Sequence, residues 1–395
     1  MDIFEKCSKQ SRADMARAMN IYPYFHALES RQDTVVTMEG KRRIMLGSNN
    51  YLGLTINEEV IEAGIKAYRD YGSGCSGSRF LNGTLKLHLE FEEKISKFLG
   101  KQAAMTFSTG FQSNLGLISA LVTKRDYVIM DKENHASLYD GCRLSFGTML
   151  RYRHNDMEDL ETQLQKVPEE CGSLIVTDGV FSMGGDIAKL PEICALAEKY
   201  GARVMVDDAH GLGVIGKGGR GTASYYGLED KVDIYMGTLS KSLASLGGYI
   251  AASERVIDYV KHTSRPFIFS ASMTPASCAS AIKSLEILEA NPQLVQQLQD
   301  NSRYLRQKLR ECGIKMRESN GEQVPIIPIY TYDMVKTLTI TKELYDRGVF
   351  VNCSLPPAVP PSECLLRISL MATHTRELMD EAVGIIHQVL QEHGV

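Results

Sequence analysis

The chain has 395 residues, of which 44% are hydrophobic and 23% are charged, and its formal net charge at pH 7 is −4. The composition is typical of a folded globular protein, and the length indicates two domains rather than one. The negative net charge argues against non-specific nucleic-acid binding, which depends on a basic surface, but allows a local site for a phosphorylated small molecule.

Residues 1–45 are expected to form an N-terminal arm, in which a short charged helix precedes the aromatic segment 22–25. Residues 46–285 then alternate helical patterns, such as 191–200, with short apolar runs. Most of these runs are continuously apolar, which is typical of strands covered on both faces in a mainly parallel sheet flanked by helices. The seven runs predicted as strands are 103–107, 127–130, 149–152, 174–177, 203–206, 234–236 and 249–252.

The pattern changes near Pro275, where a long helical stretch over about 276–312 leads into a second unit. This unit carries predicted strands near 326–330, 349–352 and 365–370, and it ends in a helix with its apolar residues on one face. We see no repeats and no low-complexity linker. The sequence therefore predicts an α/β fold with a large domain over 46–285 and a smaller C-terminal α+β domain over 286–395, packed tightly together.

Two glycine-rich segments resemble nucleotide-binding motifs but have the wrong context. Residues 72–77 match G-x-G-x-x-G, yet they follow the predicted helix 60–71 rather than a strand. Residues 211–217 nearly match a P-loop, but Gly218 stands where Ser or Thr would coordinate magnesium. We therefore expect no nicotinamide, flavin or nucleoside triphosphate site, and we expect the first loop to lie near a ligand or a partner subunit.

The cysteines and the first residues of the chain are informative about metal binding and about the cellular location of the protein. The nine cysteines include no Cys-x-x-Cys pair, and the sequence has no His-Glu-x-x-His helix, so we expect free thiols in a reducing compartment and no metal. Acidic residues near the start argue against a secretory signal, and no apolar run reaches the roughly 18–20 residues that cross a bilayer. A cytoplasmic protein is expected, with peripheral contact with a membrane surface left open.

The chemistry is concentrated in two polar segments that follow strongly apolar runs. Residues 206–210 contain Asp207 and His210, and residues 237–243 place Lys241 among small hydroxyl residues. Pyridoxal phosphate (PLP) needs an amine for a Schiff base, a carboxylate for its ring nitrogen and a hydrogen-bond partner for its ring hydroxyl. Each signal alone is weak, since a lysine is usually a surface residue and aspartates commonly cap turns. Together they predict a PLP site in which burial lowers the pKa of Lys241.

Further residues extend this hypothesis. His135 follows the run 127–130, where an imidazole can stack on a pyridine ring or simply be a satisfied loop histidine. Residues 108–111, with the hydroxyls of Thr238 and Ser240, are suited to the cofactor phosphate at a helix start. Arg367 interrupts an apolar strand, and a buried arginine needs an anionic partner: either a substrate carboxylate or an internal salt bridge.

These segments resemble the α-oxoamine synthases, a fold-type I family of PLP-dependent homodimers. Its members condense a small amino acid with an acyl-CoA and release carbon dioxide. The resemblance runs from Gly-Ser-Asn-Asn-Tyr-Leu-Gly at 47–53 to Ala-Thr-His-Thr at 372–375. Its motifs include Asp-Gly-Val-Phe-Ser-Met at 178–183, Asp-Asp-Ala-His-Gly at 207–211 and Gly-Thr-Leu-Ser-Lys at 237–241.

Within this family, Ser-Arg-Phe-Leu-Asn-Gly-Thr at 78–84 and the Ser-Lys-Ser around Lys241 are most similar to the member that joins L-serine to palmitoyl-CoA. That reaction gives 3-ketodihydrosphingosine and opens sphingolipid biosynthesis. The alternative is a sister synthase, such as aminoketobutyrate CoA ligase or amino-oxononanoate synthase, using glycine or alanine with a shorter acyl-CoA. A catalytically silent partner subunit is disfavoured by the intact site residues. A PLP aminotransferase or lyase is disfavoured by the acyl-CoA-type segments near Asn50 and Arg79.

The resemblance also implies roles for individual residues. It implies that His135 stacks on the ring and contacts the substrate carboxylate, while Asp207 pairs with the ring nitrogen and His210 with the ring hydroxyl. It places the active site at the interface of a homodimer. The other residues implied are Gly110, Phe111, Ser182, Thr238 and Ser240 for the cofactor, Ser270 reaching it from the other subunit, and Asn50, Arg79 and Arg367 for the substrates.

Two positions depart from the family pattern. Gly184 stands where relatives often have an acidic residue. Leu355, before Pro356 and Pro357, stands where some members that use serine have an arginine thought to assist the substrate carboxylate. Leucine cannot do this, so the way in which the carboxylate is held is a question for the structure.

Overall fold

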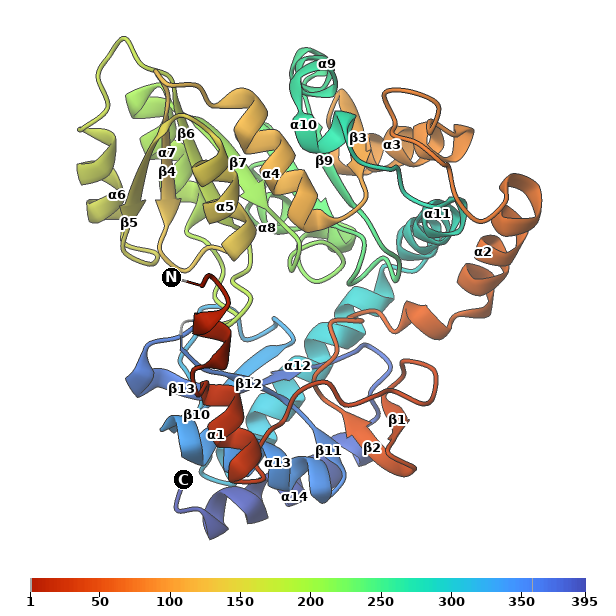
Figure 1. Cartoon of the computed structure of the whole chain (residues 1–395), viewed down its shortest axis with the longest axis vertical. Coiled ribbons are helices and arrows are strands. Elements are labelled where there is room, and N and C mark those ends of the chain that lie inside the picture. Colours follow the sequence, from red (N-terminus) through yellow and green to blue (C-terminus); the bar gives the residue numbers. More distant parts are fainter. Residues whose placement is uncertain (1, 357) are drawn as a thin grey trace.

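The seven apolar runs form one sheet, as predicted. The computed structural model describes residues 2–356 and 358–395, and Figure 1 shows this sheet in the upper of two bodies. The strand order is β3-β9-β8-β7-β6-β4-β5, and only β9 runs antiparallel to its neighbours. The strands are β3 (Ala103–Phe107), β4 (Tyr127–Asp131), β5 (Thr148–Tyr152), β6 (Ser173–Asp178), β7 (Arg203–Asp207), β8 (Ile234–Thr238) and β9 (Gly248–Ala252).

Helices cover both faces of this sheet, which explains why its strands are apolar throughout. Successive strand residues point to opposite faces. Accordingly, Ile175 and Val204 pack in one hydrophobic cluster, whereas Val176 and Met205 pack in another. The helices of this body are α2 (Glu58–Tyr71), α3 (Lys86–Leu99), α4 (Gly110–Leu121), α5 (Ala136–Leu144), α6 (Met157–Leu164), α7 (Leu190–Tyr200), α8 (Thr222–Tyr226), α9 (Glu254–Thr263), α10 (Arg265–Ile268) and α11 (Pro275–Ala290).

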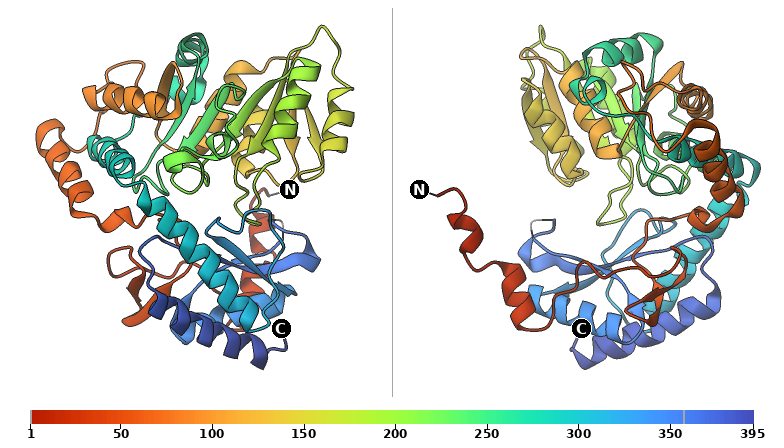
Figure 2. Two further views of the ribbon diagram at one scale, coloured as in Figure 1. Left: turned by 180° about the vertical axis from the view of Figure 1, so that it is seen from behind. Right: turned by 45° about the vertical axis from the view of Figure 1, so that its right-hand side comes forward.

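The long helical stretch predicted over about 276–312 is two helices. Helix α11 ends at Ala290, and α12 (Gln293–Glu311) begins after Asn291 and Pro292. Proline has no N–H to donate and disfavours helical backbone in the residue before it, so the helix breaks there. Figure 2 shows α12 running from the upper body along the lower one.

The lower body combines both ends of the chain. One antiparallel sheet has the order β10-β13-β12, and a second has the order β1-β2-β11, in which β2 pairs in parallel with β11. The predicted strand 349–352 is therefore divided at Val351 between two sheets. The elements are β1 (Val35–Met38), β2 (Lys41–Met45), β10 (Ile326–Tyr332), β11 (Val349–Phe350), β12 (Asn352–Ser354), β13 (Cys364–Ser369), α13 (Met334–Asp346) and α14 (Arg376–Glu392).

The N-terminal segment holds the predicted short helix, α1 (Arg12–Ala18), which begins with a capping box formed by Ser11 and Asp14. Its second half pairs with the lower body through β1 and β2, which the sequence did not indicate. The limits of the predicted arm and domains stay predictions. All nine cysteines are free. Across the described residues, no helix is both long and apolar enough to span a bilayer.

Candidate active site

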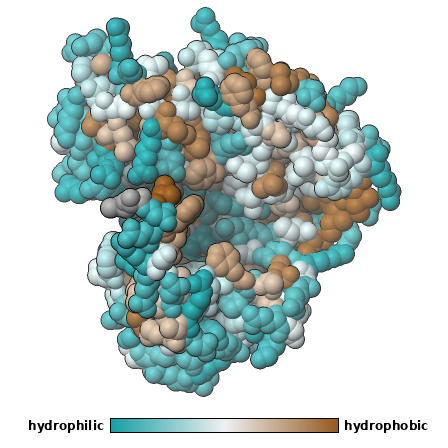
Figure 3. Space-filling view, viewed as in Figure 1, coloured by the Kyte–Doolittle hydropathy of each residue, from teal (hydrophilic) through white to brown (hydrophobic). Residues whose placement is uncertain are grey.

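The ends of three neighbouring parallel strands bring the predicted cofactor residues together. β6 ends at Asp178, β7 at Asp207 and β8 at Thr238, so these side chains share the carboxyl edge of the sheet, where α/β folds bind ligands. A cavity of about 270 Å³ lies there. Figure 3 shows this face of the molecule hollowed between its two bodies. The predicted residues that line the cavity are Gly110, Phe111, His135, Asp207, His210, Thr238, Ser240 and Lys241.

Lys241 lies in the tight loop between β8 and β9 and lines this cavity. Burial lowers the pKa of its amine to about 7, and Arg367 adds to the lowering while Asp207 opposes it. A large fraction of the amine is therefore neutral near neutral pH, which a nucleophile or general base requires. An ordinary surface lysine does not fit this environment.

The two adjacent aspartates have different surroundings. Asp207 accepts hydrogen bonds on Oδ2 from Asn114 Nδ2 at 2.7 Å and on Oδ1 from the Ala209 N–H at 3.0 Å. Asp208 instead accepts from the Thr222 N–H at 2.6 Å and the Thr222 hydroxyl at 2.7 Å. Burial raises the pKa of Asp208 to about 6. Asp208 is therefore bonded to the start of α8, whereas Asp207 both caps the turn at the end of β7 and lines the cavity.

The two histidines both favour the neutral imidazole, although His210 is buried and His135 remains exposed at the cavity. His135 is the N-cap of α5, and its Nδ1 lies 2.7 Å from Ser137 Oγ. Burial lowers its pKa. His210 Nδ1 lies 2.6 Å from Tyr51 Oη, and burial, aided by Lys241 and Arg367, lowers its pKa well below the usual value. A neutral imidazole keeps one nitrogen free to accept or donate toward a ligand.

The opposite part of the cavity is suited to an anion. Helix α4 begins there at Gly110, and the unpaired N–H groups of a helix start attract phosphate. Thr238 Oγ1 and Ser240 Oγ lie 2.9 Å apart beside it. Position 110 must be glycine, because an added Cβ would lie 2.8 Å from Thr238 Cβ.

Arg367 lies on β13 in the lower body and reaches the sheet edge, buried to 5% exposure. Its Nε donates to the Ser182 carbonyl at 2.5 Å, Nη1 to Ser369 Oγ at 2.7 Å and Nη2 to Asn49 Oδ1 at 3.2 Å. All three acceptors are neutral. In the part of the chain that the structure describes, no carboxylate forms an ion pair with Arg367, so the internal salt bridge considered for it is not formed.

Five predicted site residues do not line this cavity: Arg367, Ser182, whose carbonyl accepts from Arg367, and three others described next. Arg79 is buried in an ion pair with Glu92 at 2.6 Å, and its Nη1 also donates to Thr106 Oγ1 at 2.6 Å. Asn50 donates to Thr55 Oγ1 at 2.7 Å. Ser270 lies beside a second, much smaller pocket. The substrate or cofactor roles of all five stay predictions, and within this chain Arg79 and Asn50 bond to neighbouring side chains instead.

Three residues that the sequence analysis did not single out hold the site together. Asn114, Tyr51 and Ser137 are each at most 1% exposed and hydrogen-bond to the predicted residues. The signal available was a polar residue in a mostly apolar helix, as for Asn114 directly before the apolar stretch 115–118. Such residues are buried only when they have partners, but the sequence does not say which partners.

The structure also shows the surroundings of Gly184 and Leu355, the two positions that depart from the family pattern. An added Cβ at Gly184 would lie 2.2 Å from Asp186 Oδ2 and 3.1 Å from Arg317 Cζ, so a larger residue needs these side chains to move. Leu355 packs beside Ala16 and Ile21 of the N-terminal segment. Pro357, which belongs to the same motif, lies outside the described residues.

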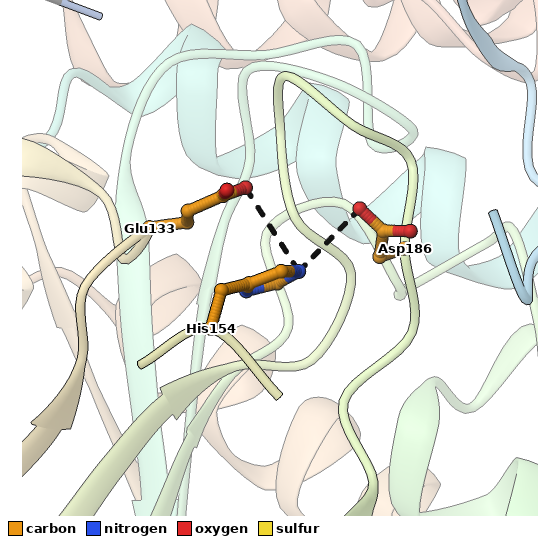
Figure 4. A group of neighbouring side chains, drawn as sticks. All are labelled: Glu133, His154 and Asp186. Atoms are coloured by element: carbon orange, nitrogen blue, oxygen red, sulfur yellow. Dashed lines mark ion pairs between the residues drawn. The ribbon is translucent and has the colours of Figure 1, made fainter. Parts of the chain in front are cut away.

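A second charged cluster lies close by, and Figure 4 shows its central residues, Glu133, His154 and Asp186. His154 Nδ1 lies 3.0 Å from Asp131 Oδ1, and its Nε2 lies 3.5 Å from Asp186 Oδ2. Arg317, from the segment between α12 and β10, donates to both Glu133 oxygens at 3.1 Å. Three carboxylates thus face two cationic side chains, and the cluster ties the lower body to the sheet edge.

The fold and the cavity define a class of enzyme. The family model described as aminotransferase class I and II matches residues 41–386. More narrowly, the chain belongs to the PLP-dependent α-oxoamine synthase family. The donor set described above fits PLP, since it supplies an available amine, a carboxylate, a neutral imidazole and a helix start with two hydroxyls.

Individual relatives support this membership along the whole chain. Serine palmitoyltransferase of Sphingobacterium spiritivorum is 52% identical over 388 residues, covering 98% of this chain and 96% of the relative. The 8-amino-7-oxononanoate synthase of Thermoanaerobacter pseudethanolicus is 40% identical over 388 residues, with coverages of 98% and 96%. A lysine-to-alanine variant of serine palmitoyltransferase from S. paucimobilis, solved with a bound PLP–myriocin aldimine, is 36% identical with a TM-score of 0.96 and full coverage of both chains.

Proposed function

We propose that this chain condenses L-serine with palmitoyl-CoA, with loss of carbon dioxide and coenzyme A, to give 3-ketodihydrosphingosine. It is then a PLP-dependent acyltransferase of sphingolipid biosynthesis. The assignment of L-serine and palmitoyl-CoA as substrates rests on sequence identity. Over nearly the whole chain, the identity is 52% to a serine palmitoyltransferase and 40% to an amino-oxononanoate synthase. The cavity around Lys241 supplies the groups that the chemistry needs.

PLP, when bound, supplies an aldehyde that bonds amines covalently and a pyridinium ring that withdraws electrons from the substrate Cα. Lys241 would hold this aldehyde through its amine, and as a free amine it would remove the Cα proton of the substrate as a general base. Its pKa of about 7 suits both tasks, because the neutral amine is abundant at working pH. Asp207 keeps the ring nitrogen protonated, and His210 hydrogen-bonds the ring hydroxyl.

The remaining cavity residues hold the two ends of the bound molecules. The start of α4, with Thr238 and Ser240, binds the phosphate. His135 stacks on the ring, and with Arg367 it orients the substrate carboxylate, which must be held so that the breaking bonds align with the ring system. Arg367 suits this role because its guanidinium is buried with neutral acceptors only, and a buried cation gains strongly from an anionic partner.

The chain is further proposed to act as a homodimer whose partner covers the cavity mouth. Leu246 and Phe111 line the cavity and are 57% and 43% exposed, and Phe269 is 77% exposed. Large exposed apolar side chains around a site indicate an interface. The N-terminal 3-10 helix (Glu5–Ser8) also projects away from both bodies in Figure 2. Analytical ultracentrifugation tests the dimer, and cell fractionation tests the predicted cytoplasmic location and any membrane contact.

The deciding experiment is an absorbance titration of the PLP-loaded protein with L-serine, glycine and L-alanine, followed by palmitoyl-CoA and mass spectrometry of the product. We expect a spectral response to L-serine and formation of 3-ketodihydrosphingosine. A response to glycine or alanine alone, with turnover of a shorter acyl-CoA, would assign the chain to a sister synthase. A protein that takes up no PLP would contradict the proposed chemistry.

A further inference from the structure

A buried polar network lies behind the two side chains that are proposed to contact the PLP ring. Asn114, in the second turn of α4, is 1% exposed. Its Nδ2 donates to Asp207 Oδ2 at 2.7 Å and to Ser137 Oγ at 2.8 Å. Ser137 Oγ in turn lies 2.7 Å from His135 Nδ1. One amide group therefore connects the carboxylate proposed for the ring nitrogen with the imidazole proposed to stack on the ring.

The orientation of this amide is fixed by its surroundings. Turning it over would place Asn114 Oδ1, rather than Nδ2, against the Asp207 carboxylate, and two acceptors would then face each other. In the observed orientation Oδ1 is buried and has no hydrogen-bond partner among the described residues. A buried unsatisfied oxygen is costly, and native proteins keep such groups mainly where they serve another purpose.

The Asp207 carboxylate has few other supports. Its second donor is the Ala209 N–H on Oδ1, so loss of Asn114 leaves Oδ2 without a partner from the described chain. The neighbouring Asp178 is also buried at the cavity, and burial together with Asp207 raises its pKa well above the usual value. This shift favours the neutral form of Asp178, while the Asn114 amide donates to Asp207, the carboxylate proposed for the ring nitrogen.

We propose that Asn114 is a positioning residue of this active site, which holds the Asp207 carboxylate directly and the His135 imidazole through Ser137. The two side chains are thereby fixed relative to each other before PLP binds. This inference rests on the proposed roles of Asp207 and His135 toward PLP. It does not depend on serine or palmitoyl-CoA as the substrates.

The first test measures the affinity of the cofactor-free chain for PLP, together with the visible circular dichroism of the bound cofactor, which reports a fixed orientation. Asn114→Ala should weaken PLP binding by roughly ten- to hundredfold, because it removes a hydrogen bond to a charged group. It should also reduce the visible dichroism. Ser113→Ala is the matched control, since Ser113 is buried one residue earlier in α4 and bonds only the Thr109 carbonyl. The control should bind PLP within about threefold of the unaltered chain.

A second variant tests the positioning role of Asn114 even where Asn114→Ala folds poorly. Asn114→Asp keeps the size and shape of the side chain but places a second carboxyl against Asp207. Relative to the unaltered chain, its PLP affinity should fall most at pH 8 and partly recover at pH 6, where the new carboxyl regains a donor by protonation. A residue with a purely structural role would show no such pH dependence.

The outcomes separate this inference from the proposed function. Equal PLP affinity, dichroism and pH dependence in both Asn114 variants and the unaltered chain would overturn the inference. An equal loss in Ser113→Ala would do the same, because it would show that packing of α4 is responsible. Normal PLP binding without turnover of serine and palmitoyl-CoA would contradict only the proposed function.

Discussion

Two groups of charged side chains lie against the same edge of the large sheet, and they are built in opposite ways. At the cavity, Lys241 and the nearby Arg367 form no ion pair with a carboxylate of the described residues, and the pKa of Lys241 is lowered to about 7. In the neighbouring cluster, burial opposes protonation of His154, yet Asp131, Asp186 and Glu133 raise its pKa to about 10. The cations of the first group have no ion-pair partner, whereas both cations of the second group are paired with carboxylates.

This difference distinguishes a ligand site from a structural one. Buried charges without partners cost free energy unless a ligand supplies the opposite charge, so they persist where a ligand binds. Buried charges that are already paired contribute to stability and leave little for a ligand. Substitutions in the cavity should therefore change turnover, whereas substitutions in the cluster should change stability.

The largest effect is expected at Lys241. Lys241→Ala removes both the amine that bonds PLP and the general base, so kcat should fall by at least about a thousandfold. The absorbance of the covalently bound cofactor should disappear with it. Lys217→Ala, at an exposed loop position, is the control and should retain normal kcat. Full turnover by Lys241→Ala would disprove its assignment.

Arg367 should show the next largest effect. Arg367→Lys keeps the charge but loses the planar fork that holds a carboxylate, so kcat/KM for L-serine should fall by roughly a hundredfold. Steady-state kinetics should show the KM for palmitoyl-CoA nearly unchanged, which serves as the internal control. An equal change in both KM values would indicate general damage to the site rather than loss of carboxylate binding.

In the cluster, Arg317→Ala should affect stability rather than chemistry. It leaves Glu133 and Asp186 with His154 as their one cationic partner among the described residues, and the free energy of unfolding should fall by about 2 kcal/mol. Urea denaturation measures this change, and kcat should stay within a few-fold. Arg310→Ala, which breaks an exposed pair with Glu322, should cost less than about 1 kcal/mol. Equal effects of the two variants on stability would show that the buried cluster contributes no more than an exposed ion pair.

The smallest effect is a pH dependence of stability at His154. Because its pKa is raised from 6.5 to about 10 on folding, its ion pairs stabilise the protein fully below pH 6.5. That contribution falls as pH rises and is lost above about 10. His154→Gln should therefore lower the free energy of unfolding more at pH 6 than at pH 10. His262→Gln, at an exposed position, should show no such difference.

Local patterns predicted the large sheet well, because its strands are buried on both faces and read as continuous apolar runs. They also placed Asp207, His210 and Lys241 correctly at strand ends, since the side chains that follow parallel strands must share one edge. Pairing between distant segments was not visible in the same way. Strands β1 and β2 join the C-terminal body through β11, and a pairing across some 300 residues leaves no mark on either segment alone.

The sequence by itself determined the fold class, the family and the residues proposed to bear the chemistry, because residue type and spacing along one strand or loop are local properties. The tertiary structure alone decided how neighbouring or distant side chains divide their tasks. In the structure, Asp207 and Asp208 have different hydrogen-bond partners, and Arg79 forms an ion pair with Glu92.

Arg367 has no carboxylate partner among the described residues, and Asn114 donates to Asp207 at the cavity. The reason is physical: burial, pKa and hydrogen-bond partners depend on which segments pack together, and packing is a property of the whole chain.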